Sequence, residues 1–327
     1  MSDKKFLSGH KQLEEKITEW KCIAGKNMKV NFVTQYTGQR VYAITISDFS
    51  FCSHDKKVLY ISQPHAHEPA GTAGMIDVIE QLLTGKDTSG NTANIDIEKT
   101  LKNTVLTFNP IGNPQGRDRS PVPFFDGTIY KDNEFYCIMY GEDPENPGKR
   151  WKRVDLWDVR EEKSYPEFIG IGYEQLDEYR YAEPNRYNLS SHMKLFYMHH
   201  SEYNYKYWLD LHQTEFKNSN YNAMVYLPSL SSFSPITEAG NYKWAGKITS
   251  AWLRMGINPK DPAPLNATGQ QAEYFKAIFG GLNKSMHTLL IEVKNNTLDF
   301  PPLLQMEAHV SAIKTSINML LTGGLER

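Results

Sequence analysis

Short apolar runs rich in β-branched and aromatic residues mark the predicted strands of this chain. Most of these runs are continuous rather than alternating, which is typical of strands buried on both faces of an α/β sheet. The runs lie at residues 57–62, 104–108, 207–211, 223–227 and 287–293. Two further β-rich runs, at 29–36 and 40–47, flank a Thr-Gly pair and predict a hairpin near the start of the chain.

Apolar residues spaced by three or four positions predict helices between the strands. Leu13, Ile17 and Trp20 form the first such stripe. Comparable stripes predict helices at residues 71–85, 237–255, 270–279 and 304–321. Strands that alternate with helices predict an α/β fold, and the absence of an internal repeat favours one domain over residues 1–327. Between about 117 and 205 the periodicity is weak, so we predict a long irregular insertion there.

The composition is that of an ordinary globular protein. The chain has 327 residues, of which 40% are hydrophobic and 23% charged, and its formal net charge is −2. Without a basic surplus we expect no nucleic-acid partner, and without a long apolar stretch we expect no membrane partner. The three widely spaced cysteines and the lack of an apolar leader predict a cytoplasmic protein with reduced thiols, and a Cys22–Cys52 disulfide is the alternative. The oligomeric state is left open.

Metal-binding residue types lie at the ends of three predicted strands. His65 and Glu68 follow the strand at 57–62, His212 follows a second strand, and Glu292 lies near the end of a third. Ligands bind beyond the carboxyl ends of strands in open α/β sheets. Imidazole and carboxylate are ligands of catalytic zinc, and a separate carboxylate can act as a general base. The pattern therefore predicts a zinc-dependent hydrolytic site.

These residues together resemble the funnelin zinc carboxypeptidases, the family related to carboxypeptidase A. The resemblance rests on H-x-x-E at His65 and Glu68, on the N-P-Q-G loop at 113–116, and on His212 and Glu292 in that order. It implies a three-layer α/β/α sandwich with a mixed, mainly parallel central sheet. It also implies one zinc ion held by His65, Glu68 and His212, with Glu292 as the general base for a zinc-bound water.

The resemblance further implies residues that bind the substrate. The family clamps the terminal carboxylate of its substrate with an Asn-Arg pair, for which Asn185 and Arg186 are the candidates. It often uses a mobile tyrosine, for which Tyr274 is the candidate by position. A second alignment places Trp157 and Asp158 where the pair would stand. In that alignment the clamp is missing, and the substrate is not an ordinary peptide with a free carboxyl group.

An arginine that stabilises the oxyanion is also implied by the resemblance. Arg117 directly follows the N-P-Q-G loop and is the first candidate, with Arg119 and Arg150 as alternatives. One metal ligand has two candidates, because His67 could bind the metal in place of His65.

The expected function is a zinc-dependent metallocarboxypeptidase that acts on a peptide or small amide substrate. One alternative is an amidohydrolase or deacylase of N-acyl amino acids or of a specialised metabolite on the same fold. Another is a non-catalytic protein that binds peptide or zinc, which would need no base; Glu292 could then pair with Lys294. The His-x-His pair at 65 and 67 also occurs in amidohydrolase barrels, but such barrels need eight βα units, and this chain shows too few.

Overall fold

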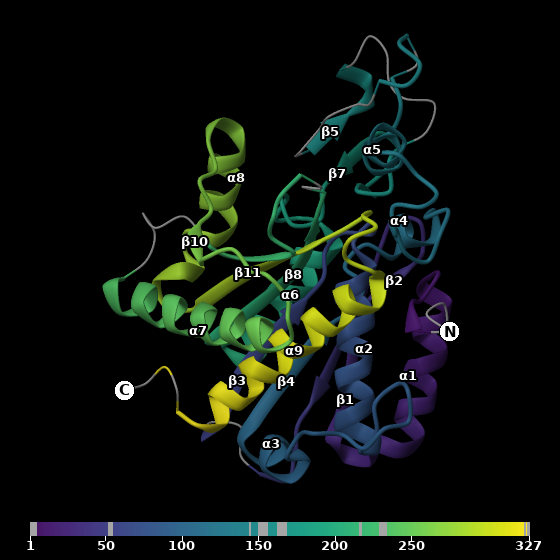
Figure 1. The fold of residues 1–327 in the computed structure, drawn as a ribbon. Helices are drawn as coiled ribbons and strands as arrows, with labels where there is room; N and C mark the ends of the chain where they lie inside the picture. Colours follow the sequence, from purple (N-terminus) through teal and green to yellow (C-terminus); the bar gives the residue numbers. More distant parts are fainter. Residues whose placement is uncertain are drawn as a thin grey trace.

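A mixed sheet of eight strands lies at the centre of the computed structural model, which describes residues 5–51, 55–143, 145–149, 156–161, 169–215, 218–228, 234–323 and 325 (Figure 1). Within these residues the strand order is β1-β2-β4-β3-β8-β11-β9-β10. The strands are β1 Met28–Thr34, β2 Arg40–Ile46, β3 Lys57–Ser62, β4 Thr104–Asn109, β8 Tyr207–Thr214, β9 Ala223–Leu227, β10 Ala263–Pro264 and β11 His287–Lys294. The central strands β4, β3, β8 and β11 are parallel, whereas β2 and β9 pair antiparallel with them. The predicted mixed, mainly parallel sheet is confirmed.

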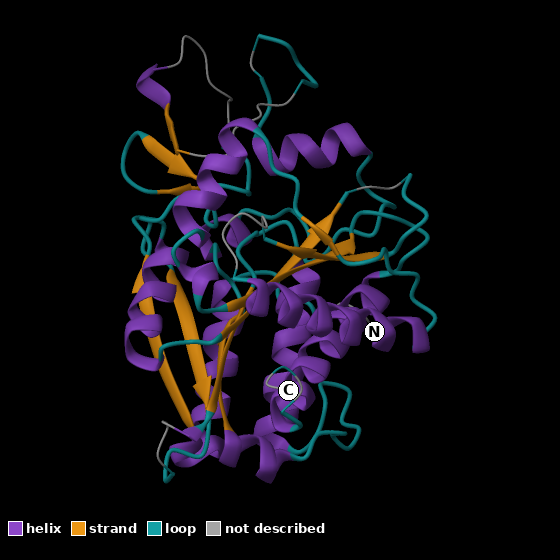
Figure 2. Cartoon of the chain, turned by 90° about the vertical axis from the view of Figure 1, so that its left-hand side faces the viewer, coloured by secondary structure: helices purple, strands orange, loops and turns teal. Residues whose placement is uncertain are grey.

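Helices cover both faces of this sheet (Figure 2). One layer contains α1 His10–Ala24, α2 Pro69–Thr84, α7 Pro235–Arg254 and α9 Pro302–Leu321, and the other contains α6 Ser191–Tyr203 and α8 Gly269–Phe279. Alternation along β3 separates the two cores, because Leu59 and Ile61 pack in the first and Val58 and Tyr60 in the second. This is the predicted three-layer sandwich. No helix in the described parts is long and apolar enough to cross a membrane.

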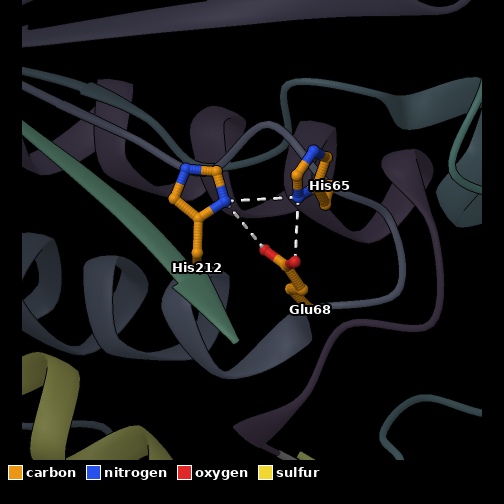
Figure 3. Close-up of side chains that lie close together, drawn as sticks. All are labelled: His65, Glu68 and His212. Carbon is orange, nitrogen blue, oxygen red and sulfur yellow. Dashed lines mark hydrogen bonds and ion pairs between the residues drawn. The ribbon is translucent and has the colours of Figure 1, made fainter. Parts of the chain in front are cut away.

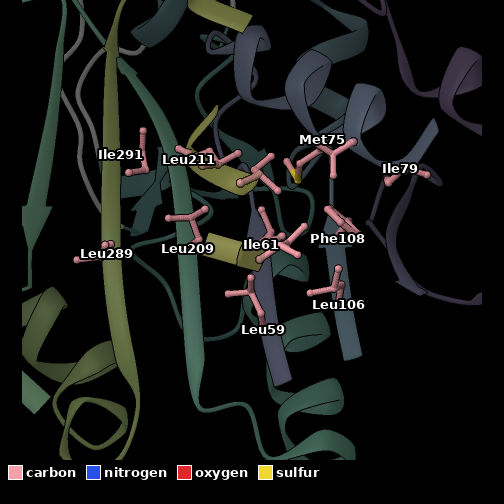
Figure 4. Packing of buried hydrophobic residues seen from close by; sticks show 14 of the residues in the cluster. Leu59, Ile61, Met75, Ile79, Leu106, Phe108, Leu209, Leu211, Leu289 and Ile291 are labelled. Atoms are coloured by element: carbon pink, nitrogen blue, oxygen red, sulfur yellow. The ribbon is translucent and has the colours of Figure 1, made fainter. Parts of the chain in front are cut away.

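Apolar side chains from neighbouring strands form a continuous layer on the face of the sheet that α2 covers (Figure 4). Full burial of one such side chain stabilises a fold by about 1.5–3 kcal/mol. The layer therefore fixes the strands on which the candidate site is built. Its labelled members are Leu59, Ile61, Leu106, Phe108, Leu209, Leu211, Leu289 and Ile291, with Met75 and Ile79 from α2.

The interval 117–205 is more regular than we predicted. Besides α6 it contains the helix α5 Asp132–Tyr140 and a small sheet in the order β5-β7-β6. The strands of this sheet are β5 Leu156–Asp158, β6 Glu174–Gln175 and β7 Arg180–Ala182. Two shorter helices, α3 Ile97–Asn103 and α4 Pro114–Asp118, lie earlier in the chain. Elements of two to nine residues are too short to produce a clear hydrophobic period, which explains the weak signal in the sequence.

His309 is a buried histidine of α9 at the contact with α2. A Cβ atom added to Gly74 would lie 2.9 Å from the Cβ atom of His309, so the two helices approach closely there. Neither ring nitrogen of His309 has a hydrogen-bond partner among the described residues. Burial lowers the pKa of His309 to about 3, so the native protein holds this ring neutral.

We predict that His309 makes the fold sensitive to acid. The unfolded chain protonates this histidine below its ordinary pKa of about 6.5, whereas the native protein does not until about 3. The resulting loss of stability is about 2 kcal/mol at pH 5 relative to pH 8. In His309→Leu this part of the pH dependence should disappear, as measured by urea unfolding of metal-free protein at both pH values. An equal pH dependence in the variant and the parent protein would contradict the prediction.

Candidate metal centre and substrate site

Two histidines and a glutamate converge beyond the carboxyl end of β3 (Figure 3). His65 Nδ1 lies 2.8 Å from Glu68 Oε1, and His212 Nδ1 lies 3.3 Å from Glu68 Oε2. The two Nδ1 atoms are 3.2 Å apart. The three residues are between 3% and 6% exposed. The structure thus brings together the three predicted metal ligands from two separate parts of the chain.

The sheet and one tight turn place these side chains. β3 ends at Ser62, and the following loop turns so that the Glu68 N–H donates to the His65 carbonyl oxygen at 3.2 Å. β3 and β8 pair in parallel with Ser62 opposite Asp210. Since His212 lies two residues further along β8, it comes beside the loop that carries the other two side chains.

The outer nitrogen of each histidine faces a carboxylate. His212 Nε2 lies 2.8 Å from Asp210 Oδ2, and His65 Nε2 lies 3.0 Å from Glu183 Oε1. A neutral histidine that donates from Nε2 carries no proton on Nδ1. Both inner nitrogens are therefore free to bind a metal, and the carboxylates fix the orientation of the rings.

Hydrogen bonds hold Asp210 in turn. Ser62 Oγ donates to Asp210 Oδ1, and Trp208 Nε1 donates to Ser62 Oγ at 2.8 Å. Each of these residues is fully buried. The ring of His212 is consequently fixed by a chain of contacts that extends into the core of the protein.

The three converging groups fit a divalent cation. Two Nδ1 lone pairs and a carboxylate repel one another at these distances unless protons or a metal ion lie between them. In the metal-free protein burial lowers the pKa of His65. The nearby carboxylates of Glu68 and Glu183 raise it by more, so that the pKa is about 10. A metal ion replaces such protons when it binds. Two imidazoles and one carboxylate with an open position form the ligand set of a catalytic zinc.

Glu292 lies beside these ligands on the neighbouring strand. β11 and β8 pair in parallel with Glu292 opposite His212. Burial raises the pKa of Glu292, and despite the opposing effect of His212 its value is about 7. The Lys294 ammonium group contacts Asp299 Oδ2 at 2.8 Å. A carboxylate with this pKa can accept and release a proton at neutral pH.

Asn185 and Arg186 reach the site through Glu183. Arg186 Nε lies 2.8 Å from Glu183 Oε2, and the other oxygen of that carboxylate faces His65. Asn185 Oδ1 lies 3.1 Å from His65 Nε2. Arg186 Nη1 is buried and has no hydrogen-bond partner among the described residues. A buried guanidinium with a spare N–H group can bind an anion.

The alternative alignment of the Asn-Arg pair places its residues in other surroundings. Trp157 is buried in β5, where its ring packs against Tyr173 at a centroid distance of 6.2 Å. Asp158 forms an ion pair with Arg160. The contacts with His65 therefore favour the pair at Asn185 and Arg186.

The structure corrects the prediction for Arg117. This residue is 1% exposed, and its guanidinium donates to the backbone carbonyl oxygens of Leu7 at 2.7 Å, Ala66 at 3.1 Å and Pro123. It thus joins the N-terminal segment to the metal-binding loop and is not available to an oxyanion.

Of the two alternatives to Arg117, the structure describes Arg119. Arg119 is likewise held by backbone carbonyl oxygens, those of Ile169 and Tyr173 at 2.9 Å each. Arg150 lies outside the described residues.

Two tyrosines lie in segments close to Arg186, and Tyr274 stays a prediction. Tyr274 lies on α8, next to Phe275, whose ring is 5.5 Å from the Arg186 guanidinium. Tyr140, at the end of α5, lies within electrostatic range of Glu183 and Arg186, and burial raises its pKa. Helical periodicity gave no reason to select Tyr140 among the many aromatic residues of this interval.

Glu183 and Asp210 are further site residues that sequence reasoning missed. Asp210 had a signal, because residues two apart on a strand share a face and His212 was already a candidate. Glu183 had none, since its contact with His65 depends on how the interval after β4 folds back.

Solved structures of metallocarboxypeptidases share this arrangement of elements. Carboxypeptidase A from Helicoverpa armigera matches with a TM-score of 0.60 and 11% identity, over 97% of this chain and 73% of that one. A metallo-carboxypeptidase from Pseudomonas aeruginosa in complex with (2-guanidinoethylmercapto)succinic acid matches with a TM-score of 0.58 and 13% identity, over 96% of this chain and 69% of that one. Bovine thrombin-activatable fibrinolysis inhibitor in complex with tick carboxypeptidase inhibitor matches with a TM-score of 0.57 and 12% identity, over 98% of each chain.

The chain has the fold of a metallocarboxypeptidase. No family model matches its sequence, and a search of curated proteins finds no match either. At this low identity the likeness establishes the metallocarboxypeptidase fold, and the roles of individual residues depend on the contacts described above.

We predict that Asp210→Asn weakens zinc binding about 10- to 100-fold, because an amide no longer fixes the His212 ring with its charge. Competition with a chelating indicator measures the affinity. Asp77→Asn is a matched control, since Asp77 is a buried carboxylate of α2 that accepts hydrogen bonds from Gln81 and Thr88. Equal zinc affinity in the two variants would contradict an orienting role for Asp210.

Proposed function

We propose that this chain is a zinc-dependent metallocarboxypeptidase that hydrolyses a C-terminal peptide or amide bond. The observation that carries the proposal is the convergence of His65, Glu68 and His212 with Glu292 on the adjacent strand. The metallocarboxypeptidase fold supports it. A protein that only binds zinc would have no use for a carboxylate of raised pKa beside the ligands.

His65 Nδ1, His212 Nδ1 and a Glu68 oxygen would hold one zinc ion. When bound, zinc polarises a carbonyl group and lowers the pKa of water. Glu183 and Asp210 contact the Nε2 atoms and would hold the two imidazoles, once the metal has displaced the Nδ1 proton, in the tautomer that leaves Nδ1 unprotonated. The chain itself would therefore supply ligands that are already oriented toward the metal.

Glu292 would transfer the proton. Its carboxylate oxygen accepts a proton from the attacking water and then gives that proton to the nitrogen of the leaving amine. A pKa of about 7 suits both steps, because the group is neither too weak a base nor too weak an acid at neutral pH.

Asn185 and Arg186 would bind the terminal carboxylate of the substrate. Arg186 offers a buried N–H group, and its contact with Glu183 fixes the guanidinium close to His65. Arg186 also lies within electrostatic range of Glu292. The carboxylate of a bound peptide would thus lie near both the metal ligands and the base.

Glu292→Gln tests the chemistry. We expect turnover to fall by at least about 10²-fold while zinc remains bound, because an amide cannot accept the proton. Steady-state kinetics with a peptide library and metal analysis give the two measurements. Glu174→Gln is the control, since Glu174 is a buried carboxylate that accepts the Ser191 N–H. Unchanged turnover in Glu292→Gln would exclude its role as base.

Arg186→Lys tests the carboxylate clamp. Lysine keeps the charge but loses the planar fork, so we expect KM for peptides with a free C-terminus to rise about tenfold. Peptides with an amidated C-terminus should be poor substrates of both proteins. If the parent protein instead prefers amidated or N-acylated substrates, the clamp is wrong and the deacylase function is favoured.

A further inference from the structure

A second group of metal-binding side chains lies directly beside the first. His67, Glu68 and Glu215 each offer a ligand atom, and these atoms all lie within 4.8 Å of one another. His67 Nε2 is 3.4 Å from Glu68 Oε1, and His67 is only 4% exposed. Glu68 therefore belongs to both groups.

The loop after β3 and the end of β8 place this second group. The imidazoles of His67 and His65 are stacked, with centroids 5.1 Å apart and planes at 14°. Asn295 Nδ2 donates to the His67 carbonyl oxygen at 2.9 Å and holds the loop against the segment that follows β11. Glu215 comes three residues after His212, immediately beyond β8.

Buried polar atoms of this group lack partners. Glu215 Oε1 and His67 Nδ1 have no hydrogen-bond partner in the described parts of the chain, whereas Glu68 Oε2 lies 3.3 Å from His212 Nδ1. Burial of a carboxylate is costly without a partner of opposite charge. A carboxylate oxygen of this kind, beside a buried imidazole and a second carboxylate, indicates a place for a cation.

The charges around the site support the same conclusion. Glu68, Asp210, Glu183, Glu215 and Glu292 act on one another or on shared neighbours. Among the described residues, Arg186 is the cation that faces them. A cation held by His67, Glu68 and Glu215 would thus meet several acidic side chains and one arginine.

We propose that His67, Glu68 and Glu215 form a second divalent-cation site, joined to the first through Glu68. The inference rests on the proposed zinc centre, because the two sites share a ligand. One imidazole and two carboxylates are suitable ligands for Zn²⁺. Paired metal ions in hydrolases stabilise both the attacking and the leaving atoms, so the second site would extend the electrostatic stabilisation of the reaction.

Zinc stoichiometry of the full chain tests the site without relying on activity. Metal-free protein is titrated with Zn²⁺ by calorimetry, and bound metal is counted by mass spectrometry after dialysis. We expect two ions in the parent protein and in the Glu174→Gln control. We expect one ion in Glu215→Gln and in His67→Gln, because each loses a ligand of the second site only.

His212→Gln separates this inference from the proposed function. One ion in the parent protein that persists in Glu215→Gln and is lost in His212→Gln overturns the second site and keeps the first. Glu215 would then be free to meet a cationic group of the substrate. One ion that persists in His212→Gln and is lost in Glu215→Gln overturns the zinc centre of the proposed function. The parent stoichiometry alone decides the matter if a variant does not fold.

Discussion

Two imidazole nitrogens and a carboxylate meet within 3.3 Å of one another in the interior of this protein, and this contact requires a proton or a cation between them. Each group would be better solvated in water, and burial without a partner costs several kcal/mol. In the metal-free protein the partner is a proton, because Glu68 and Glu183 raise the pKa of His65. A metal ion that binds there would displace this proton, and a rigid scaffold keeps the three groups together in both states.

The parallel strands supply that rigidity through alternation. Along β8, Leu209 and Leu211 point into the apolar layer on the face that α2 covers, while Asp210 and His212 point to the opposite face. A single strand thus anchors the site on one side and presents it on the other. The pairing of Glu292 with His212 extends the same principle to β11. A shift of one residue in either strand would exchange the two faces and destroy both the core and the site.

The parts of the fold and site that could be predicted from the sequence are those fixed by local pattern. Continuous apolar runs gave the central strands, and polar residues at their ends gave His65, Glu68, His212 and Glu292. The direction of a long side chain is not a local property. Arg117 follows a loop that marks the site, yet its guanidinium turns to carbonyl oxygens of Leu7 and Ala66.

Glu183 is a site residue that local sequence pattern could not predict. No pattern in the chain connects it with His65, which lies far earlier in the sequence, and the two meet because the interval after β4 folds back over the site. Its two oxygens have different partners, since one contacts the His65 imidazole and the other contacts Arg186. A change in Arg186 would therefore reach His65 through one carboxylate. Under the proposed function, metal binding and substrate binding would be coupled, because one side chain contacts a residue of each.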